Sequence, residues 1–152
     1  MKYILITTLF IGTLFLSGCS LDGGGSGSSF GGVLKSEDGG KSWTEVIRSN
    51  FPDAMSRIHA GRLSDGRFYL IGNQTRNFMN RNFFSIMLSD DGAKFNRIIR
   101  LIEEPTHQRF KGHLKVDGYQ YPNCLIEKDK LLVVYSVNKE DIEIGIIETN
   151  KI

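Results

Sequence analysis

The stretch that decides the fold is Ser36-Glu37-Asp38-Gly39-Gly40-Lys41-Ser42-Trp43, which fits the pattern S-x-D-x-G-x-x-W. Serine and aspartate side chains close turns by bonding to nearby backbone groups, and glycine takes the positive φ that tight hairpins need. We therefore expect Ser36 and Asp38 to hydrogen-bond across a hairpin turn and Gly40 to adopt positive φ. We also expect Trp43 to place its ring in the core.

A degenerate second copy of the pattern reads Ser89-Asp90-Asp91-Gly92-Ala93-Lys94-Phe95. Phe95 comes one position early, and Ala93 stands where the glycine would be. The pattern resembles the Asp-box, or bacterial neuraminidase repeat, of sialidase-like β-propellers, in which the box is a structural clasp away from the catalytic face. Along the sequence, Ser36 and Ser89 are separated by about the length of one propeller blade. The resemblance thus implies structural roles for Ser36, Asp38, Gly40, Trp43, Ser89, Asp91 and Phe95.

Short apolar segments separated by turn residues make up most of the remaining chain. Segments of this length, rich in Phe, Tyr, Ile and Val, predict strands, and the clearest are residues 33–34, 67–71, 83–88, 98–102, 131–137 and 142–148. Residue types that favour turns lie between these segments, at 64–66, 89–92, 127–130 and 138–141. Only residues 52–59 are compatible with a helical turn or two. We predict an all-β partial propeller of two to three four-stranded antiparallel blades, after an N-terminal signal helix.

The beginning of the chain reads as an export signal. A short positive start, Met1-Lys2-Tyr3, precedes an apolar run over residues 4–16, which is too short for a comfortable membrane span. Leu16-Ser17-Gly18-Cys19 resembles the lipobox of bacterial lipoproteins. That resemblance implies cleavage before a lipidated Cys19 and an exported protein anchored to a membrane, periplasmic or at the cell surface. The alternative is a buried apolar strand or helix that ends in Gly-Cys.

The expected organisation has four parts: a signal peptide over residues 1–18, a Gly/Ser-rich tether over 19–32, an Asp-box hairpin over 33–50 and propeller blades over 51–152. Lipidation of Cys19 leaves Cys124 as a lone thiol. We expect no disulfide, and we expect Cys124 to serve as a small buried hydrophobe.

Composition excludes several classes of function. With 19 Lys+Arg against 17 Asp+Glu, the net charge of +2 is too balanced for a nucleic-acid binder. His59, His107 and His113 share no zinc spacing, so we expect no metal and no other cofactor. Asn138-Lys139-Glu140-Asp141 matches a guanine-binding motif, but without a phosphate loop it is a turn between two strands.

Residues 51–147 as a whole resemble the carboxyl-terminal third of bacterial exo-sialidase-type proteins. The landmarks include Phe51-Pro52-Asp53-Ala54 and Gly118-Tyr119-Gln120-Tyr121-Pro122. Sialidases use a tyrosine nucleophile, because the carboxylate on the anomeric carbon of their substrate would repel a carboxylate nucleophile. Three arginines hold that carboxylate, a glutamate deprotonates the tyrosine, and an aspartate protonates the leaving group.

The resemblance implies that Tyr121 matches the nucleophile and Arg81 the last arginine of the triad. Tyr119 is the nearest competitor of Tyr121, and Arg109 is a weaker candidate for ligand contact. Each assignment has a structural alternative. An arginine stem can cover a sheet edge, and a tyrosine can pack with its hydroxyl bonded to the backbone.

The chain also departs from the family pattern. Residues 55–73, where the family places its glutamate and middle arginine, contain Arg57, Arg62 and Arg67 but no glutamate. Removal of residues 1–18 leaves 134 residues, which is short of the four to eight blades of a closed ring. We expect an incomplete sialidase-like lipoprotein, related to glycoside hydrolases that act on sialylated glycans and inactive by itself.

Two alternatives remain open. The first is a non-catalytic propeller module that binds a glycan or protein at the cell surface, and the second is a degraded or fused reading frame without a role. Expected partners are a glycan or protein ligand and the membrane, through the lipid on Cys19, with no nucleic acid. Self-association through open blade edges is expected as well.

Overall fold

The computed structural model describes residues 13–16, 30–52, 54 and 56–152. These residues form ten strands, one short 3₁₀ turn at Thr149–Lys151 and no α-helix. The strands are β1 (Thr13–Leu16), β2 (Phe30–Lys35), β3 (Ile47–Pro52), β4 (His59–Arg62), β5 (Phe68–Gly72), β6 (Phe84–Ser89), β7 (Arg97–Ile102), β8 (Tyr119–Glu127), β9 (Lys130–Val137) and β10 (Asp141–Glu148). The expected all-β class is confirmed.

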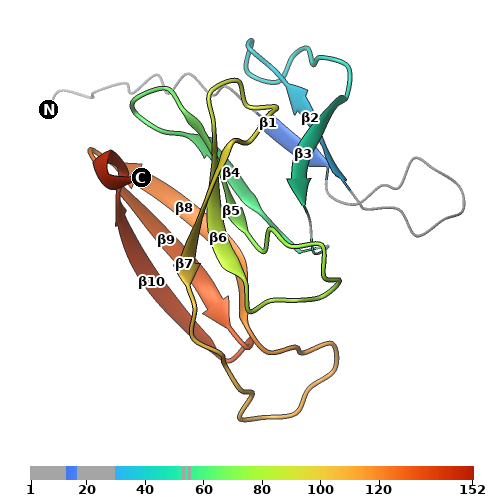
Figure 1. The fold of residues 1–152 in the computed structure, drawn as a ribbon, viewed down its shortest axis with the longest axis vertical. Coiled ribbons are helices and arrows are strands. Elements are labelled where there is room, and N and C mark those ends of the chain that lie inside the picture. Colours follow the sequence, from blue (N-terminus) through green and yellow to red (C-terminus); the bar gives the residue numbers. More distant parts are fainter. Residues whose placement is uncertain (1–12, 17–29, 53, 55) are drawn as a thin grey trace, which may run out of the picture.

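The strands form three antiparallel meanders, ordered β1-β2-β3, β4-β5-β6-β7 and β8-β9-β10 (Figure 1). Within each sheet, each strand pairs antiparallel with the next along the chain. The arrangement confirms a partial propeller of consecutive blades. Within the described residues the central sheet has four strands, and the two flanking sheets have three each.

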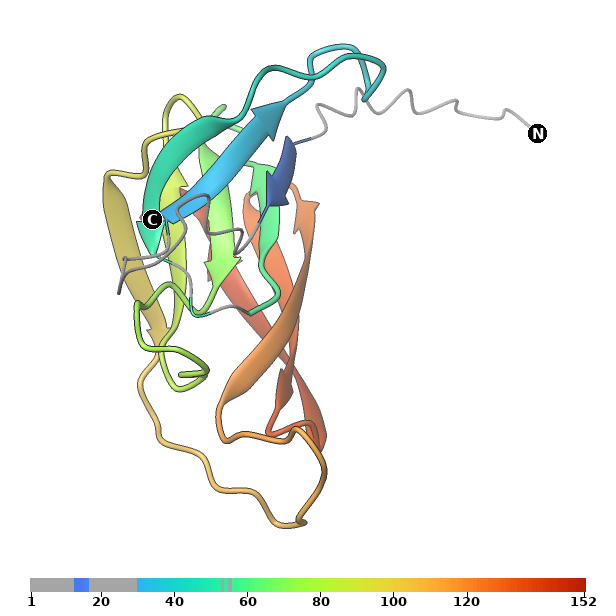
Figure 2. The same ribbon diagram turned by 90° about the vertical axis from the view of Figure 1, so that its right-hand side faces the viewer.

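The central sheet is covered on both faces, as Figures 1 and 2 show. Side chains alternate between the faces of a strand, so Tyr69 and Ile71 pack against the sheet β8–β10. Leu70 and Met87 face the other way and pack with Val33 of β2. Burial of each large apolar side chain contributes about 1.5–3 kcal/mol. These two apolar layers therefore hold the three sheets together.

Three expectations about local structure need correction. Residues 52–59 contain no helix where they are described: β3 runs to Pro52 and β4 begins at His59, so strand pairing takes up both ends of the segment. Neither β3 nor β4 is predicted from the sequence, because their polar residues mask the strand pattern. The signal helix is not shown either, since the described residues Thr13–Leu16 form β1, paired with β2. A short apolar run does not distinguish strand from helix.

The rest of the expected leader, with Cys19, lies outside the described residues, and so does most of the expected tether. The strand β2 begins at Phe30, inside the segment expected to be tether. Within the described part of the chain, no helix has the length and apolar character needed to cross a membrane.

The turns and connections gather at two opposite ends of the sheets (Figure 1). We call one the box end: it carries the turns 36–46, 63–67, 90–96 and 128–129. We call the other the loop end: it carries the described residues 54 and 56–58, the connections 73–83 and 103–118, and the turn 138–140. All the residues expected to contact substrate belong to the loop end or to its border.

Candidate functional site

The first Asp-box forms the expected clasp. The hydroxyl of Ser36 donates to Oδ1 of Asp38 (2.9 Å) and accepts from the backbone N–H of Gly40 (2.7 Å). Asp38 also accepts from Ser42, through both its hydroxyl (2.6 Å) and its N–H (2.9 Å). These bonds, with the Ser42 hydroxyl contributing most, lower the pKa of Asp38 to about 2. Gly40 has a φ of +88°, as predicted.

Trp43 does not enter the core, contrary to the prediction. Its ring is 42% exposed, and its Nε1 donates to the carbonyl of Gly40 at 3.1 Å. The matching aromatic of the second box, Phe95, is buried because it packs edge-on against Phe51 of the preceding sheet, with ring centroids 5.7 Å apart. Among the described residues, no sheet precedes β1–β3 to cover Trp43 in the same way.

The second Asp-box is also a clasp. Ser89 donates to Asp91 (3.0 Å), and Asp91 accepts from the backbone N–H groups of Ala93 and Lys94, both at 2.8 Å. The N–H of Lys94 contributes most to the lowered pKa of Asp91, which is about 2. Both boxes are therefore structural, and neither aspartate is a candidate catalytic acid.

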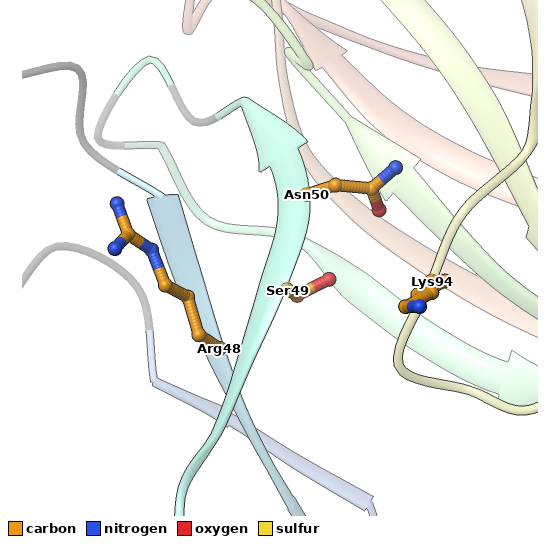
Figure 3. Close-up of a pocket in the computed structure, with 4 residues that line it drawn as sticks. All are labelled: Arg48, Ser49, Asn50 and Lys94. Carbon is orange, nitrogen blue, oxygen red and sulfur yellow. The ribbon is translucent and has the colours of Figure 1, made fainter.

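A pocket of about 450 Å³ lies where the second box meets β3, lined by Arg48, Ser49, Asn50 and Lys94. Ser49 and Asn50 point toward the segment that carries Lys94, whereas Arg48 points away from it (Figure 3). Asn50 bonds to both the N–H (2.8 Å) and the carbonyl (2.9 Å) of Phe95, and Ser49 donates to the carbonyl of Ala93. These polar groups bond the sheet β1–β3 to the sheet β4–β7, so we interpret the pocket as part of the contact between two sheets and not as a ligand site.

Most of the described non-glycine residues with positive φ lie at the loop end or on its border. Six described non-glycine residues have positive φ, and five of them lie at this end or on its border: Met79, Leu114, Tyr121, Asn138 and Lys139. Each such conformation costs about 1–3 kcal/mol and persists only where the surrounding structure enforces it, and these conformations cluster at functional sites. The geometry therefore marks the loop end as the candidate site.

Tyr121 lies at an irregularity in β8. The pairing with β9 shifts between Gln120 and Asn123, so Tyr121 and Pro122 together stand opposite the single residue Tyr135. Bulges of this kind re-aim a side chain. Tyr121 has a φ of +56°, although the proline after it restricts its backbone further, and it is 47% exposed. The ammonium group of Lys139 lies 5.5 Å from the centre of its ring.

Arg81 is held in place by its backbone and by its side chain. Its carbonyl accepts from the N–H of Tyr119 (2.8 Å) and from Nδ2 of the buried Asn73 (3.2 Å). Its guanidinium is buried and donates to the carbonyl of Ala54 at 3.3 Å. Gly118 is needed beside it, because a Cβ there would lie 2.3 Å from the carbonyl of Arg81. The structure thus joins the backbones of Arg81 and Tyr119, and the Arg81 side chain faces the interior.

Tyr119 has the structural role of a packed tyrosine whose hydroxyl bonds to the backbone, and it is not open to a substrate. Its ring is buried beside Phe84 and Tyr135, and its hydroxyl donates to the carbonyl of Glu104 (2.9 Å). Burial raises the pKa of this hydroxyl. A pocket of about 640 Å³ opens beside it, between the end of β7 and the sheet β8–β10, and Glu143 on its wall accepts from the Tyr135 hydroxyl (2.9 Å).

Arg109 binds acidic side chains of its own chain. Its Nη2 lies 2.7 Å from both carboxylate oxygens of Asp141, and its Nε lies 3.3 Å from Glu140. Glu140 also accepts from Lys115, which contributes most to its lowered pKa of about 2, and from the N–H of Phe110 (2.8 Å). These bonds fasten the connection 103–118 to the turn 138–140, so the Arg109 guanidinium is already engaged.

Two residues that organise the loop end were missed as functional candidates. Asn138 accepts from the N–H of Gly118 (2.8 Å) and the hydroxyl of Thr106 (2.6 Å), inside the turn that the sequence does predict. Asn73 donates to the carbonyls of Arg81, Phe83 and Tyr119. An asparagine just after a strand was the available signal, since this residue type bonds readily to backbone groups.

The remaining candidates are separated by the fold. Arg57 is exposed at the loop end, whereas Arg62 and Arg67 lie toward the box end, where Arg67 pairs with Asp65 (2.6 Å). Cys124 is a free, half-buried thiol packed against the core, and burial raises its pKa to about 12. No group of three or more His, Cys, Asp or Glu in the described part of the chain could hold a metal ion.

Comparison with known proteins agrees with this geometry. A family model described as a BNR repeat-like domain matches residues 27–134. The chain belongs to the BNR repeat-like domain family. A solved structure titled "Sialidase" resembles 76% of the chain, with a TM-score of 0.58 and 34% sequence identity. The match covers 11% of that sialidase's own chain, and no curated protein matches. The sialidase-like BNR relationship and the propeller fold expected from the sequence are confirmed.

Proposed function

We propose that the loop end of this BNR repeat-like chain recognises sialylated glycans, with Tyr121 as the contacting side chain, and that the chain alone does not hydrolyse them. The observation that carries the proposal is the bulge in β8, which holds Tyr121 exposed at positive φ immediately before Pro122. A strand that only packed against its neighbours would gain nothing from this strained geometry. The similarity to a sialidase supports the choice of ligand.

Positive charge near Tyr121 suits the carboxylate of a sialic acid. Lys139 lies over the tyrosine ring, and the exposed Arg57 belongs to the same end of the molecule. The Tyr121 phenol and the Lys139 ammonium group beside it offer hydrogen bonds and positive charge to an acidic sugar. Arg81 supports this surface from beneath, through the bond between its carbonyl and the N–H of Tyr119.

Hydrolysis demands more than the described residues supply. A tyrosine nucleophile needs a base to remove its proton, and the leaving group needs an acid. In the described part of the chain, no carboxylate bonds to the Tyr121 hydroxyl, and Arg109 is engaged by Asp141. A site of this kind is expected to bind a sialylated glycan without releasing sialic acid.

Saturation-transfer NMR on the full chain tests the binding, with sialyllactose and lactose as paired ligands. We expect saturable binding of sialyllactose, no comparable binding of lactose, and a loss of about tenfold or more in affinity for Tyr121→Ala. Trp43→Ala, which removes an exposed ring at the box end, is the control and should bind normally. Equal binding of both ligands, or normal binding by Tyr121→Ala, would contradict the proposal.

Turnover is tested with a fluorogenic sialoside. We expect no release of sialic acid by the full chain. Release that disappears in Tyr121→Phe would show that the chain is a complete enzyme and would overturn the inactive assignment. Tyr121→Phe keeps the ring and removes only the hydroxyl, so it separates chemistry from packing.

We propose further that the chain is exported and anchored to a membrane through a lipid on Cys19, on the basis of the Leu16-Ser17-Gly18-Cys19 pattern. Metabolic labelling with a radioactive fatty acid in a bacterial host should mark the wild-type protein and not Cys19→Ser. Labelling that persists in Cys19→Ser, or its absence from the wild type, would refute the anchor.

A further inference from the structure

The sheet β8–β10 turns an apolar face away from the rest of the molecule. Ile142, Ile144 and Ile146 of β10 are 77%, 64% and 63% exposed. The strand register places Ile144 beside Val134, and it places Ile146 beside Leu132, which in turn neighbours Leu125. We call these six residues the outer face: Leu125, Leu132, Val134, Ile142, Ile144 and Ile146. In Figure 1 this sheet forms the left margin of the molecule.

The repeated sheets show how the position equivalent to Ile146 is covered elsewhere in the chain. Val33 and Ile86 each stand three residues before a box serine, Ser36 or Ser89, and both are fully buried between sheets. Ile146 stands three residues before Thr149, which follows β10 at the place where Ser36 follows β2 and Ser89 ends β6. In the first two sheets, therefore, the next sheet covers this position. Within the described residues, no sheet follows β8–β10.

The outer face is large enough to form a specific contact. At roughly 100 Å² for each aliphatic side chain, the outer face offers about 500–600 Å² of apolar surface. Together with the residues around its border, this area approaches the roughly 800 Å² that each partner buries in a specific interface. The charged residues Glu127, Lys130 and Glu148 form one cross-strand row that borders the outer face at the box end. The centre is uncharged, so burial there carries no cost for desolvating a charge.

We propose that a second copy of this chain covers the outer face with its own outer face, related by a two-fold axis. A two-fold contact uses the same patch on both partners, so an apolar, uncharged patch is its own complement. Two sheets then pack face to face, as the central sheet already does on both of its sides within this chain. The self-association expected through open blade edges is thereby assigned to a face instead.

Sedimentation equilibrium of the full chain is the first measurement. We expect a dimer, and we expect Ile144→Asp and Leu125→Asp each to weaken it by about a hundredfold, because a charge would be buried without a partner. Phe78→Asp is the matched control: Phe78 is 70% exposed but lies outside the outer face, so the dimer should persist. Circular dichroism verifies that each variant keeps its strands.

The two substitutions separate a face contact from an edge contact. Leu125 lies on β8 at the far side of the sheet from β10, so pairing through the β10 edge would survive Leu125→Asp. Cross-linking tests the symmetry, because a two-fold axis through the face brings the same residue of both copies together. With Cys19 and Cys124 replaced by serine, Ile144→Cys should therefore cross-link to itself with a short bismaleimide, and Phe78→Cys in the same background should not.

A monomeric wild type, a dimer that survives Leu125→Asp, a larger or open-ended assembly, or failure of Ile144→Cys to cross-link to itself would each overturn the proposal. None of these readouts depends on glycan binding or on turnover. Failure of the dimer is thus distinguishable from failure of the proposed function.

Discussion

Replacement of Asn73 tests how the loop end is built. Asn73 is fully buried, and its Nδ2 donates to the carbonyls of Tyr119 (3.1 Å), Arg81 (3.2 Å) and Phe83 (3.3 Å). One amide group thus joins the connection 73–83 to the start of β8. Asn73→Ala removes this one amide donor, and with it all three hydrogen bonds, and leaves a small cavity behind.

The expected loss of stability follows from these contacts. Each net hydrogen bond contributes about 0.5–1.5 kcal/mol, and a buried carbonyl left without a donor costs about 1–3 kcal/mol. The carbonyl of Arg81 keeps the N–H of Tyr119 as a donor, which limits the loss. Oδ1 of Asn73 accepts no hydrogen bond in the structure, so its removal offsets part of the loss. We expect Asn73→Ala to lower the free energy of unfolding by about 2 kcal/mol.

Urea unfolding followed by circular dichroism measures this change. The midpoint should fall while the slope m stays constant, since the surface exposed on unfolding is nearly the same. Asn73→Asp should lose more than Asn73→Ala, because a carboxylate would face three carbonyl oxygens. Asn123→Ala, an exposed asparagine of β8, is the control and should change little. A loss below about 0.5 kcal/mol for Asn73→Ala, or an aspartate tolerated as well as alanine, would refute the reasoning.

Two further predictions concern the same end of the molecule. Gly118→Ala should unfold at a clearly lower temperature than Gly39→Ala, because both glycines have positive φ but only at Gly118 would a Cβ meet the Arg81 backbone; equal melting temperatures would contradict this. Glu140→Gln should be less stable than wild type at neutral pH. The folded pKa of Glu140 is about 2, below its ordinary 4.5, so its contribution is present above pH 4.5 and lost as pH falls toward 2. Thermal unfolding across pH should show the two proteins converging near pH 2, and a constant difference would exclude the ion pair with Lys115 as its cause.

Much of the fold was predictable because its signals are local. The bonds of Ser36 and Asp38 reach at most four residues along the chain, so the motif alone specifies the hairpin. Strands such as β6 and β9 follow from runs of β-branched and aromatic residues. β3 and β4 escaped prediction, because polar or small residues interrupt their apolar pattern and pairing with neighbouring strands holds them in place.

The candidate site was predictable only in part. The resemblance singled out Arg81, Arg109, Tyr119 and Tyr121 as candidates for catalysis or substrate contact, and their roles stay predictions. In the structure these residues lie at the loop end or on its border. The sequence contains no sign that Arg109 pairs with Asp141, or that Asn73 supports Tyr119, because these partners are 32 and 46 residues apart. Which side chain stays open to a ligand depends on such distant contacts.

The sequence by itself therefore determined the two clasped hairpins, the all-β class and the kinship with sialidase-like proteins. Only the tertiary structure decided that Phe95 is buried while Trp43 is exposed, and that Tyr121 is turned outward by a bulge. The physical reason is that a hairpin closes through bonds within a few residues, whereas burial and exposure depend on which sheet packs beside it.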